Sequence, residues 1–92
     1  MNLKTEQNYI YVLKSNLDGK FYTGFTTDLN NRLAEHNNGK VSSTKKRIPL
    51  EIVYYEFCLF LEDAVHREKH LKTTYGKRFI KNRIKNYLNS LK

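Results

Sequence analysis

The feature that most constrains the fold is a pair of strand-like segments joined by a short turn. Residues 9–14 (YIYVLK) and 20–26 (KFYTGFT) are rich in aromatic and β-branched residues, and the NLDG sequence between them is typical of a turn. These segments predict a β-hairpin whose loop contains either four residues or two. In both registers the numbers of facing residues add to an odd total, so Tyr11, Tyr22 and Gly24 project from the same face.

The spacing of apolar residues after the hairpin predicts one more strand and three helices. The strand is expected over residues 50–58, and the helices over residues 29–36, about 61–73 and about 77–90. Thr27 or Asp28 would cap the first helix, and Gly39 would end it. Residues 40–49 have no such periodicity and are expected to form an exposed basic loop.

The resulting order, β-β-α-β-α-α, indicates an α+β fold in which a small antiparallel sheet packs against helices. In the third strand we expect Ile52, Tyr54 and Phe57 to be among the buried residues. The chain has 92 residues, which predicts a single domain over residues 1–92 with one modest core. Its last helix, at about 77–90, is basic on the face opposite the apolar residues.

Nothing in the sequence indicates a membrane-spanning or secreted protein. No apolar run approaches the ~20 residues of a membrane span, and the first residues, MNLKTEQNY, contain no apolar region of the signal-peptide kind. The lone cysteine, Cys58, excludes an intrachain disulfide and a zinc site built from several thiolates. We therefore expect a cytoplasmic protein, and we expect it to be a monomer.

Positive charge is concentrated in the last quarter of the chain. The sequence contains 17 Lys and Arg against 9 Asp and Glu, a formal net charge of +8. The final segment has basic residues and no acidic ones: Lys69, Lys72, Lys77, Arg78, Lys81, Arg83, Lys85 and Lys92. A field of one sign attracts a polyanion, usually nucleic acid; the alternative is a solvated helix face that keeps a small protein soluble. The candidate DNA-binding residues belong to the basic loop and the last helix: Lys45, Lys46, Arg47, Lys77, Arg78 and Lys81.

Two polar features on the predicted helices add to the hairpin tyrosines. Arg32 and His36 are four residues apart, so they lie one turn above each other on the first helix. Glu68 occupies a position of an otherwise apolar stripe on the second helix. A carboxylate that faces the core is costly unless it is paired or holds a cation.

Each of these residues also has a purely structural interpretation. The two tyrosines can be half-buried aromatic residues of the strands, and the histidine can complement the dipole of its helix. The arginine can form an ion pair with Glu35 or Asp28, and the glutamate can form one with Lys72. A functional interpretation gains weight because all five residues would converge and because together they suit one reaction on an anion.

That reaction is the hydrolysis of a phosphodiester bond, which needs a water nucleophile, a base and a cation near the developing charge. Glu68 can hold a single Mg²⁺ or Mn²⁺ whose remaining shell is mostly water. Arg32 is always charged, and its forked guanidinium suits phosphate oxygens. A tyrosine has a pKa near 10, so as a base it needs a cation or a hydrogen bond that lowers this pKa. His36 or the metal can supply this cation or hydrogen bond.

The ordered set of residues resembles the paired signature of the GIY-YIG endonuclease superfamily. Tyr9-Ile10-Tyr11 is similar to the first motif of that family and Tyr22-Thr23-Gly24 to the second, and residues 21–39 resemble its second strand and first helix. Further similarities to the small stand-alone bacterial members lie at Thr44, Pro49 and Arg67-Glu68-Lys69. The resemblance covers about residues 8–75.

The resemblance implies a role for each residue of the hairpin and the first helix. Tyr11 would be the base that acts on water, and Tyr22 would orient the water or the phosphate. Gly24 would leave room for the backbone at the site. Arg32 would contact the phosphate, and His36 would tune the tyrosine.

The remaining implications concern the metal, the fold and the departures from the family pattern. Glu68 would bind the magnesium ion, and the fold would be a three-stranded antiparallel sheet flanked by helices. Some family members also use an asparagine on a later helix, for which Asn82 and Asn86 are both available. Tyr9 stands where many members have glycine and Thr23 where isoleucine is common, and neither change removes a functional group.

The leading hypothesis is therefore a Mg²⁺-dependent DNA endonuclease, selective for structure rather than sequence, that serves DNA repair or processing. Selectivity for structure is expected because the basic helix offers mainly Lys and Arg, which suit phosphates rather than base edges. Two alternatives stay open. One is a nucleic-acid-binding module without catalysis, in which the tyrosines stack on bases. The other is a nuclease subunit that is active only with a protein partner that supplies specificity.

Overall fold

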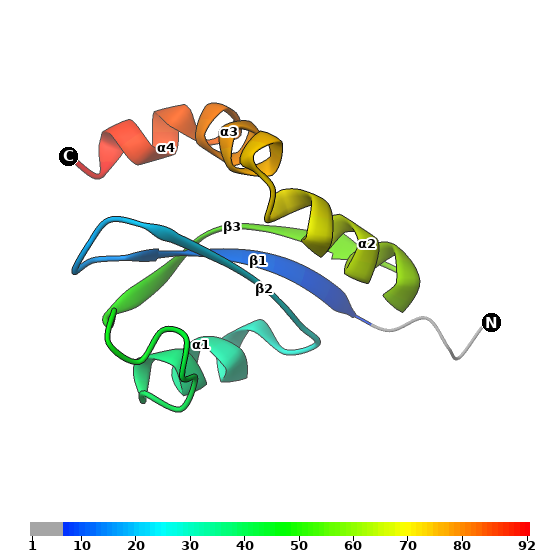
Figure 1. The fold of residues 1–92 in the computed structure, drawn as a ribbon, viewed down its shortest axis with the longest axis horizontal. Helices are drawn as coiled ribbons and strands as arrows, with labels where there is room; N and C mark the ends of the chain where they lie inside the picture. Colours follow the sequence, from blue (N-terminus) through cyan, green and yellow to red (C-terminus); the bar gives the residue numbers. More distant parts are fainter. Residues whose placement is uncertain (1–6) are drawn as a thin grey trace.

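A computed structural model of the chain describes residues 7–92, so residues 1–6 of the predicted domain lie outside the described residues. Its centre is a three-stranded antiparallel sheet in the spatial order β2-β1-β3 (Figure 1). The strands are β1 (Asn8–Ser15), β2 (Phe21–Thr26) and β3 (Leu50–Cys58). Because β1 is the central strand, its side chains are buried on both faces, which explains why its aromatic and aliphatic residues follow one another without interruption.

The β1–β2 hairpin has the four-residue loop, one of the two registers that the sequence allowed. The backbone N–H of Ser15 donates to the carbonyl of Lys20 over 2.9 Å, which closes the loop. Tyr11 lies opposite Gly24 in the adjacent strand, and Leu13 lies opposite Tyr22. The predicted sharing of one face by the two tyrosines and the glycine is confirmed.

Four helices accompany the sheet: α1 (Leu29–Asn37), α2 (Leu61–Leu71), α3 (Thr74–Arg83) and α4 (Lys85–Ser90). Helix α1 covers one face of the sheet, whereas α2 and α3 cover the other (Figure 1). The predicted α+β class and the three-stranded antiparallel sheet flanked by helices are confirmed. No helix within residues 7–92 combines the length and the apolar character that crossing a membrane requires.

The C-terminal region differs from the single helix expected over 77–90. Thr73 ends the preceding segment and caps α3, where its hydroxyl accepts a hydrogen bond from the N–H of Gly76 over 3.1 Å. Ile84 leaves the helical conformation and separates α3 from α4. Its side chain packs against the core on this side of the sheet. The apolar spacing continues across this break, so periodicity alone could not reveal it.

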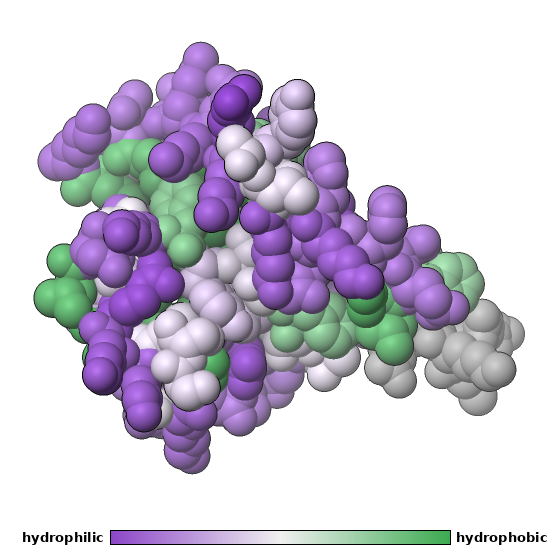
Figure 2. Space-filling model, viewed as in Figure 1, coloured by the Kyte–Doolittle hydropathy of each residue, from purple (hydrophilic) through white to green (hydrophobic). Residues whose placement is uncertain are grey.

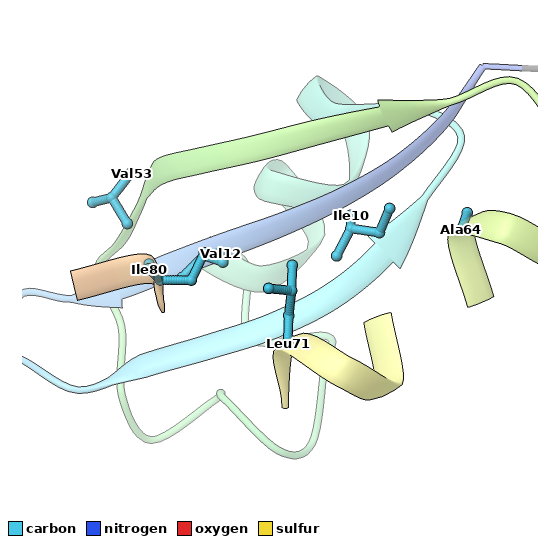
Figure 3. Packing of buried hydrophobic residues seen from close by; sticks show 6 residues of the cluster. All are labelled: Ile10, Val12, Val53, Ala64, Leu71 and Ile80. Atoms are coloured by element: carbon cyan, nitrogen blue, oxygen red, sulfur yellow. The ribbon is translucent and has the colours of Figure 1, made fainter. Parts of the chain in front are cut away.

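Two apolar clusters lie on opposite faces of the sheet, and successive β1 residues alternate between them. The cluster under α2 and α3 is the larger one and is drawn in Figure 3: Ile10, Val12, Val53, Ala64, Leu71 and Ile80. The cluster under α1 contains Tyr11, Leu13 and Leu50. The catalytic candidate Tyr11 therefore belongs to the smaller cluster, on the α1 side.

The burial expected for β3 is wrong at Phe57 and only partly right at Ile52 and Tyr54. The Phe57 side chain is 48% exposed, whereas Ile52 and Tyr54 are half-buried and the fully buried residues are Leu50 and Val53. Phe57 lies opposite Tyr9, with 5.5 Å between their ring centroids. A register shift opposite Val12 and Leu13 adds a residue to β3 and turns Val53 toward α2 and α3. A strict alternation could not anticipate this irregularity.

Candidate active site

Tyr11 is the centre of the candidate site. Its side chain is only 2% exposed and projects from the middle of β1 toward α1. Gly24 lies directly opposite in β2, and a Cβ atom at this position would collide with the Tyr11 hydroxyl. The glycine therefore makes room for the hydroxyl itself, rather than only for the backbone.

Helix α1 carries Arg32 and His36 to the Tyr11 hydroxyl. The helix begins at Asp28, whose carboxylate accepts a hydrogen bond from the Asn31 N–H over 3.1 Å. It ends before Gly39, whose φ of 74° suits a residue without a side chain. Both ends agree with the predicted signals, with Asp28 rather than Thr27 as the cap.

The hydroxyl of Tyr11 is shared by the two α1 side chains. Arg32 Nε donates to Tyr11 Oη over 3.3 Å, and Tyr11 Oη lies 2.8 Å from His36 Nε2. Tyr22 completes the group: its ring centroid is 5.1 Å from that of His36 and 6.4 Å from that of Tyr11. The structure thus brings together four of the five predicted catalytic side chains. These four, Tyr11, Tyr22, Arg32 and His36, are named the cluster.

Thr44 orients the histidine, a role that the sequence did not reveal. His36 Nδ1 lies 2.7 Å from Thr44 Oγ1, and the same hydroxyl donates to the Val41 carbonyl over 3.5 Å. In the tautomer that carries its proton at Nδ1, the N–H donates to Oγ1 and every hydroxyl keeps an acceptor, Val41 O for Thr44 and His36 Nε2 for Tyr11. His36 Nε2 then carries the lone pair and accepts the Tyr11 O–H. Both Thr44 and His36 are fully buried.

Burial is the main cause of the pKa shifts of Tyr11 and His36. It raises the pKa of Tyr11, and the hydrogen bond and charge of Arg32 act in the opposite direction without reversing the shift. Burial and then the charge of Arg32 lower the pKa of His36. The sequence led us to expect that His36 or the metal would lower the pKa of Tyr11, whereas the cation beside the hydroxyl is Arg32 and the pKa is still raised. At neutral pH the pair is a neutral phenol and a neutral imidazole.

Glu68, the fifth predicted residue, approaches from α2 on the other side of the edge strand β2. Its side chain is 20% exposed and forms an ion pair with Lys72 Nζ over 3.1 Å. Lys72 and Tyr22 line one hollow of about 220 Å³, and the charge of Glu68 contributes to the raised pKa of Tyr11. The carboxylate is thus within electrostatic reach of the cluster but is not hydrogen-bonded to it.

Some of the structural alternatives are present alongside the cluster. Arg32 Nη1 forms an ion pair with Glu35 over 3.2 Å, as Glu68 does with Lys72. Within residues 7–92 no group of three or more His, Cys, Asp or Glu side chains could hold a metal ion. A single carboxylate nevertheless suits Mg²⁺, which usually keeps several waters and binds through one or two carboxylates and substrate phosphates.

The predicted DNA-binding residues separate into different environments. Arg47, Lys77 and Lys81 line a cleft of about 720 Å³. Arg78 instead lies over the ring of Tyr75, with 5.8 Å between guanidinium carbon and ring centroid. The remaining candidates are elsewhere: Lys45 and Lys46 are exposed on the loop, and Asn82 and Asn86 are exposed on α3 and α4, with no hydrogen bond to the cluster within the described part.

Comparison with known proteins places the sequence in a family. A family model described as the GIY-YIG catalytic domain matches residues 7–85. A UPF0213 protein of Staphylococcus epidermidis is 42% identical over 69 residues, which are 74% of this chain and 83% of that protein. A UPF0213 protein of Streptococcus pyogenes serotype M3 is 42% identical over 71 residues, 76% of each chain.

A solved structure is also similar. The solution NMR structure of a UPF0213 protein from Bacillus halodurans is 32% identical, with a TM-score of 0.47, and the alignment covers 94% of this chain and 85% of that one. A GIY-YIG catalytic domain implies nuclease activity, with DNA as the substrate. With the family model matching residues 7–85, the chain belongs to the GIY-YIG family.

Proposed function

We propose that the chain is a Mg²⁺-dependent endonuclease that hydrolyses phosphodiester bonds in DNA, selective for DNA structure and active in DNA repair or processing. The observation that supports this most directly is the sharing of the Tyr11 hydroxyl by Arg32 and His36. One oxygen atom is placed between a permanent cation and a neutral imidazole, an arrangement that suits proton transfer beside a phosphate.

The raised pKa of Tyr11 favours a relay over a preformed phenolate. Tyr11 Oη takes a proton from the attacking water while its own proton passes to His36 Nε2, 2.8 Å away. The resulting hydroxide attacks phosphorus, and the leaving oxygen departs with the electron pair of the broken P–O bond and takes a proton from solvent. Thr44 holds His36 in the tautomer that has a free lone pair at Nε2. The histidine is thus the final proton acceptor, and the tyrosine is the group that contacts water.

Arg32 and Tyr22 act on the phosphate. The Arg32 side chain is 33% exposed, so its guanidinium can exchange the ion pair with Glu35 for the phosphate oxygens. It remains close to Tyr11 Oη in doing so, which keeps the phosphate next to the base. The Tyr22 ring packs against His36, and its hydroxyl is assigned the orienting role.

Glu68 is the residue that would hold the metal ion. Its carboxylate is half-buried beside the cluster, and a single carboxylate is a sufficient protein ligand for Mg²⁺ or Mn²⁺. When bound, such an ion supplies positive charge for the phosphate oxygens. Lys72 must release Glu68 for this, which an exposed lysine can do at small cost.

The test is a cleavage assay on supercoiled, branched and single-stranded DNA, with Mg²⁺, with Mn²⁺ and with chelator. Tyr11→Phe should reduce cleavage by roughly 10²–10⁴-fold while DNA binding persists, because only the base is lost. Tyr55→Phe is the matched control, since it removes a hydroxyl from the adjacent strand position outside the cluster. Arg32→Ala and Glu68→Gln should also abolish cleavage, the latter through loss of the metal.

The same assay separates the alternatives. Cleavage by Tyr11→Phe at the wild-type rate would contradict the role given to the tyrosine. DNA binding without cleavage under every metal condition, unaffected by Glu68→Gln, would instead identify a binding module without catalysis. Cleavage that appears only when a cell extract is added to the wild-type chain, and not when the extract is added to Tyr11→Phe, would identify a subunit that needs a protein partner.

A further inference from the structure

A cationic cleft lies between the tip of the β1–β2 hairpin and the α3–α4 segment. It has a volume of about 720 Å³, and its lining contains no Asp or Glu. One wall comes from the hairpin and the other from α3, α4 and the residues that follow, and together they supply six lysines: Lys14, Lys20, Lys77, Lys81, Lys85 and Lys92. Arg47 adds a seventh basic side chain.

The lysines of the cleft have no internal counter-charge. Among the described residues none of the six forms an ion pair, whereas Arg47 is paired with Asp18 over 3.1 Å. Like charges that face one hollow repel one another, and a bound polyanion removes that repulsion and gains attraction from both walls. The cleft is therefore organised for an anion longer than a single phosphate.

The apolar lining of the cleft indicates which polyanion fits. Phe21, Leu88 and Leu91 line the same cleft as the lysines, and Figure 2 shows apolar surface near α4 and the hairpin bordered by hydrophilic side chains. A duplex presents phosphates, sugars and base edges, and it keeps the flat faces of its bases stacked within. A single strand also exposes the faces of its bases, which can lie on the apolar residues while its phosphates meet the lysines.

The cleft also leads to the candidate active site. The smaller hollow of about 220 Å³ shares Phe21 and Lys77 with the cleft and extends to Tyr22 and Lys72. Lys72 is the ion-pair partner of Glu68. A strand held in the cleft is thus directed toward the residues to which cleavage is assigned.

We propose that this cleft is a binding site for single-stranded DNA, which it guides along the edge strand β2 to Tyr22. Binding in the cleft stands independently of catalysis, whereas delivery of the strand to Tyr22 rests on the proposed function. The cleft also gives a physical basis for selectivity between DNA structures. A substrate with an unpaired segment can occupy it, and a continuous duplex cannot place its bases there.

A fluorescent reporter tests occupancy directly, because the chain contains no tryptophan. Phe21→Trp places the only indole inside the cleft, and Leu91→Trp does so at a 41% exposed position where folding is not at risk. Phe57→Trp is the control, at an exposed position outside the cleft. An oligothymidylate of about 20 nucleotides, long enough to span a typical single-strand binding site, is added with chelator so that nothing is cut. It should quench the first two reporters and leave the third unchanged.

Charge variants test the walls. Lys20→Glu/Lys85→Glu reverses one lysine on each wall, and Lys40→Glu/Lys69→Glu makes the same change in net charge at exposed positions outside the cleft. The cleft variant should bind the oligothymidylate on the order of tenfold more weakly than the control variant. Its salt dependence should also become shallower, by roughly 0.7 in log–log slope for each phosphate that the variant no longer binds.

The outcomes distinguish the cleft from the proposed nuclease. Equal affinities of the two charge variants, or quenching at position 57 without quenching at 21 and 91, would overturn the cleft even if the protein cuts DNA. Tighter binding of a duplex of the same length would overturn its preference for a single strand. Quenching at positions 21 and 91 in a protein that cuts nothing would support the cleft and contradict only the delivery of the strand to a nuclease site.

Discussion

At the scale of single residues, the candidate site is a chain of hydrogen bonds rather than a set of independent side chains. Arg32 donates to the Tyr11 hydroxyl, the hydroxyl faces His36, and His36 is held in turn by Thr44. Each member is satisfied by the next, which is how buried polar groups are retained at small cost. Removal of one member therefore leaves its neighbour buried without a partner.

Gly24→Ala tests the contact between the edge strand and the tyrosine. The added Cβ collides with the Tyr11 hydroxyl, so we expect a loss of about 1–3 kcal/mol in the free energy of unfolding, measured by urea denaturation. The Cβ would also meet the ring carbon Cζ, which Tyr11→Phe keeps, so the partner variant is Tyr11→Ala. It removes both atoms, and the double variant should be more stable than the sum of the single changes predicts. Strictly additive losses would show that the collision is relieved elsewhere.

Thr44→Val tests the orientation of the histidine. The change keeps the shape of the side chain but leaves His36 Nδ1–H without its acceptor, which should cost about 1–3 kcal/mol of stability. Imidazole ¹⁵N shifts should report a loss of the single tautomer, and the pH profile of cleavage should change with it. Thr44→Ser keeps the hydroxyl and should retain both the tautomer and the profile. Wild-type shifts in the valine variant would contradict the positioning role.

At the scale of elements, the hairpin and α1 supply the cluster, and α2 supplies Glu68 from the opposite face of the sheet. Glu68 is within electrostatic reach of Tyr11 across β2, because this strand lies at the edge and carries Gly24 at the position facing Tyr11. An edge strand without a side chain at that position allows groups from both faces to approach each other. The location of the site thus follows from the strand order.

Helix α3 provides a matched pair for a test of DNA binding. Lys81 lines the cleft, whereas Arg78 lies over the ring of Tyr75, outside the cleft lining. Lys81→Gln should therefore weaken binding of single-stranded DNA and reduce the log–log salt slope by roughly 0.7, and Arg78→Gln should change the slope much less. The measurement is fluorescence anisotropy over a range of salt concentrations. Equal changes in the two variants would mean that α3 acts only through net charge.

At the scale of the whole molecule, a buried neutral histidine couples folding to pH. Because burial lowers the pKa of His36 in the folded state, the unfolded chain binds the extra proton first, at its ordinary pKa of about 6.5. The free energy of unfolding should therefore fall as pH decreases below about 6.5, by at most about 1.4 kcal/mol per pH unit for this one group. His36→Gln should flatten that segment of the pH–stability curve, and an unchanged slope would exclude His36 as its source.

A second decrease should follow at lower pH, from carboxylates whose pKa values are lowered in the folded state. The hydrogen bonds from Arg67 lower the pKa of Glu56, and the backbone hydrogen bond of Lys20 lowers that of Asp18. Their stabilisation is present above the unfolded pKa and is lost as pH falls through the folded one. These groups lie outside the cluster, so His36→Gln should leave this acid segment unchanged.

Much of the fold was predictable because its signals are local. The turn residues and the strand-like segments predicted the hairpin, and the Asp28 cap with Gly39 predicted α1. The register shift in β3 and the break at Ile84 were not predictable, since each depends on what packs against that residue. Local patterns carry no information on such packing.

Local sequence patterns show which residues share an element and a face. The two-residue period of a strand places Tyr11, Gly24 and Tyr22 on one side of the hairpin, and the helical period places Arg32 and His36 one turn apart. These patterns do not show that α1 packs on that same side and buries the Tyr11–His36 pair, which follows from the packing of the helix on the sheet. Burial sets the direction of both pKa shifts, and burial depends on the elements that cover a residue rather than on its neighbours in the chain.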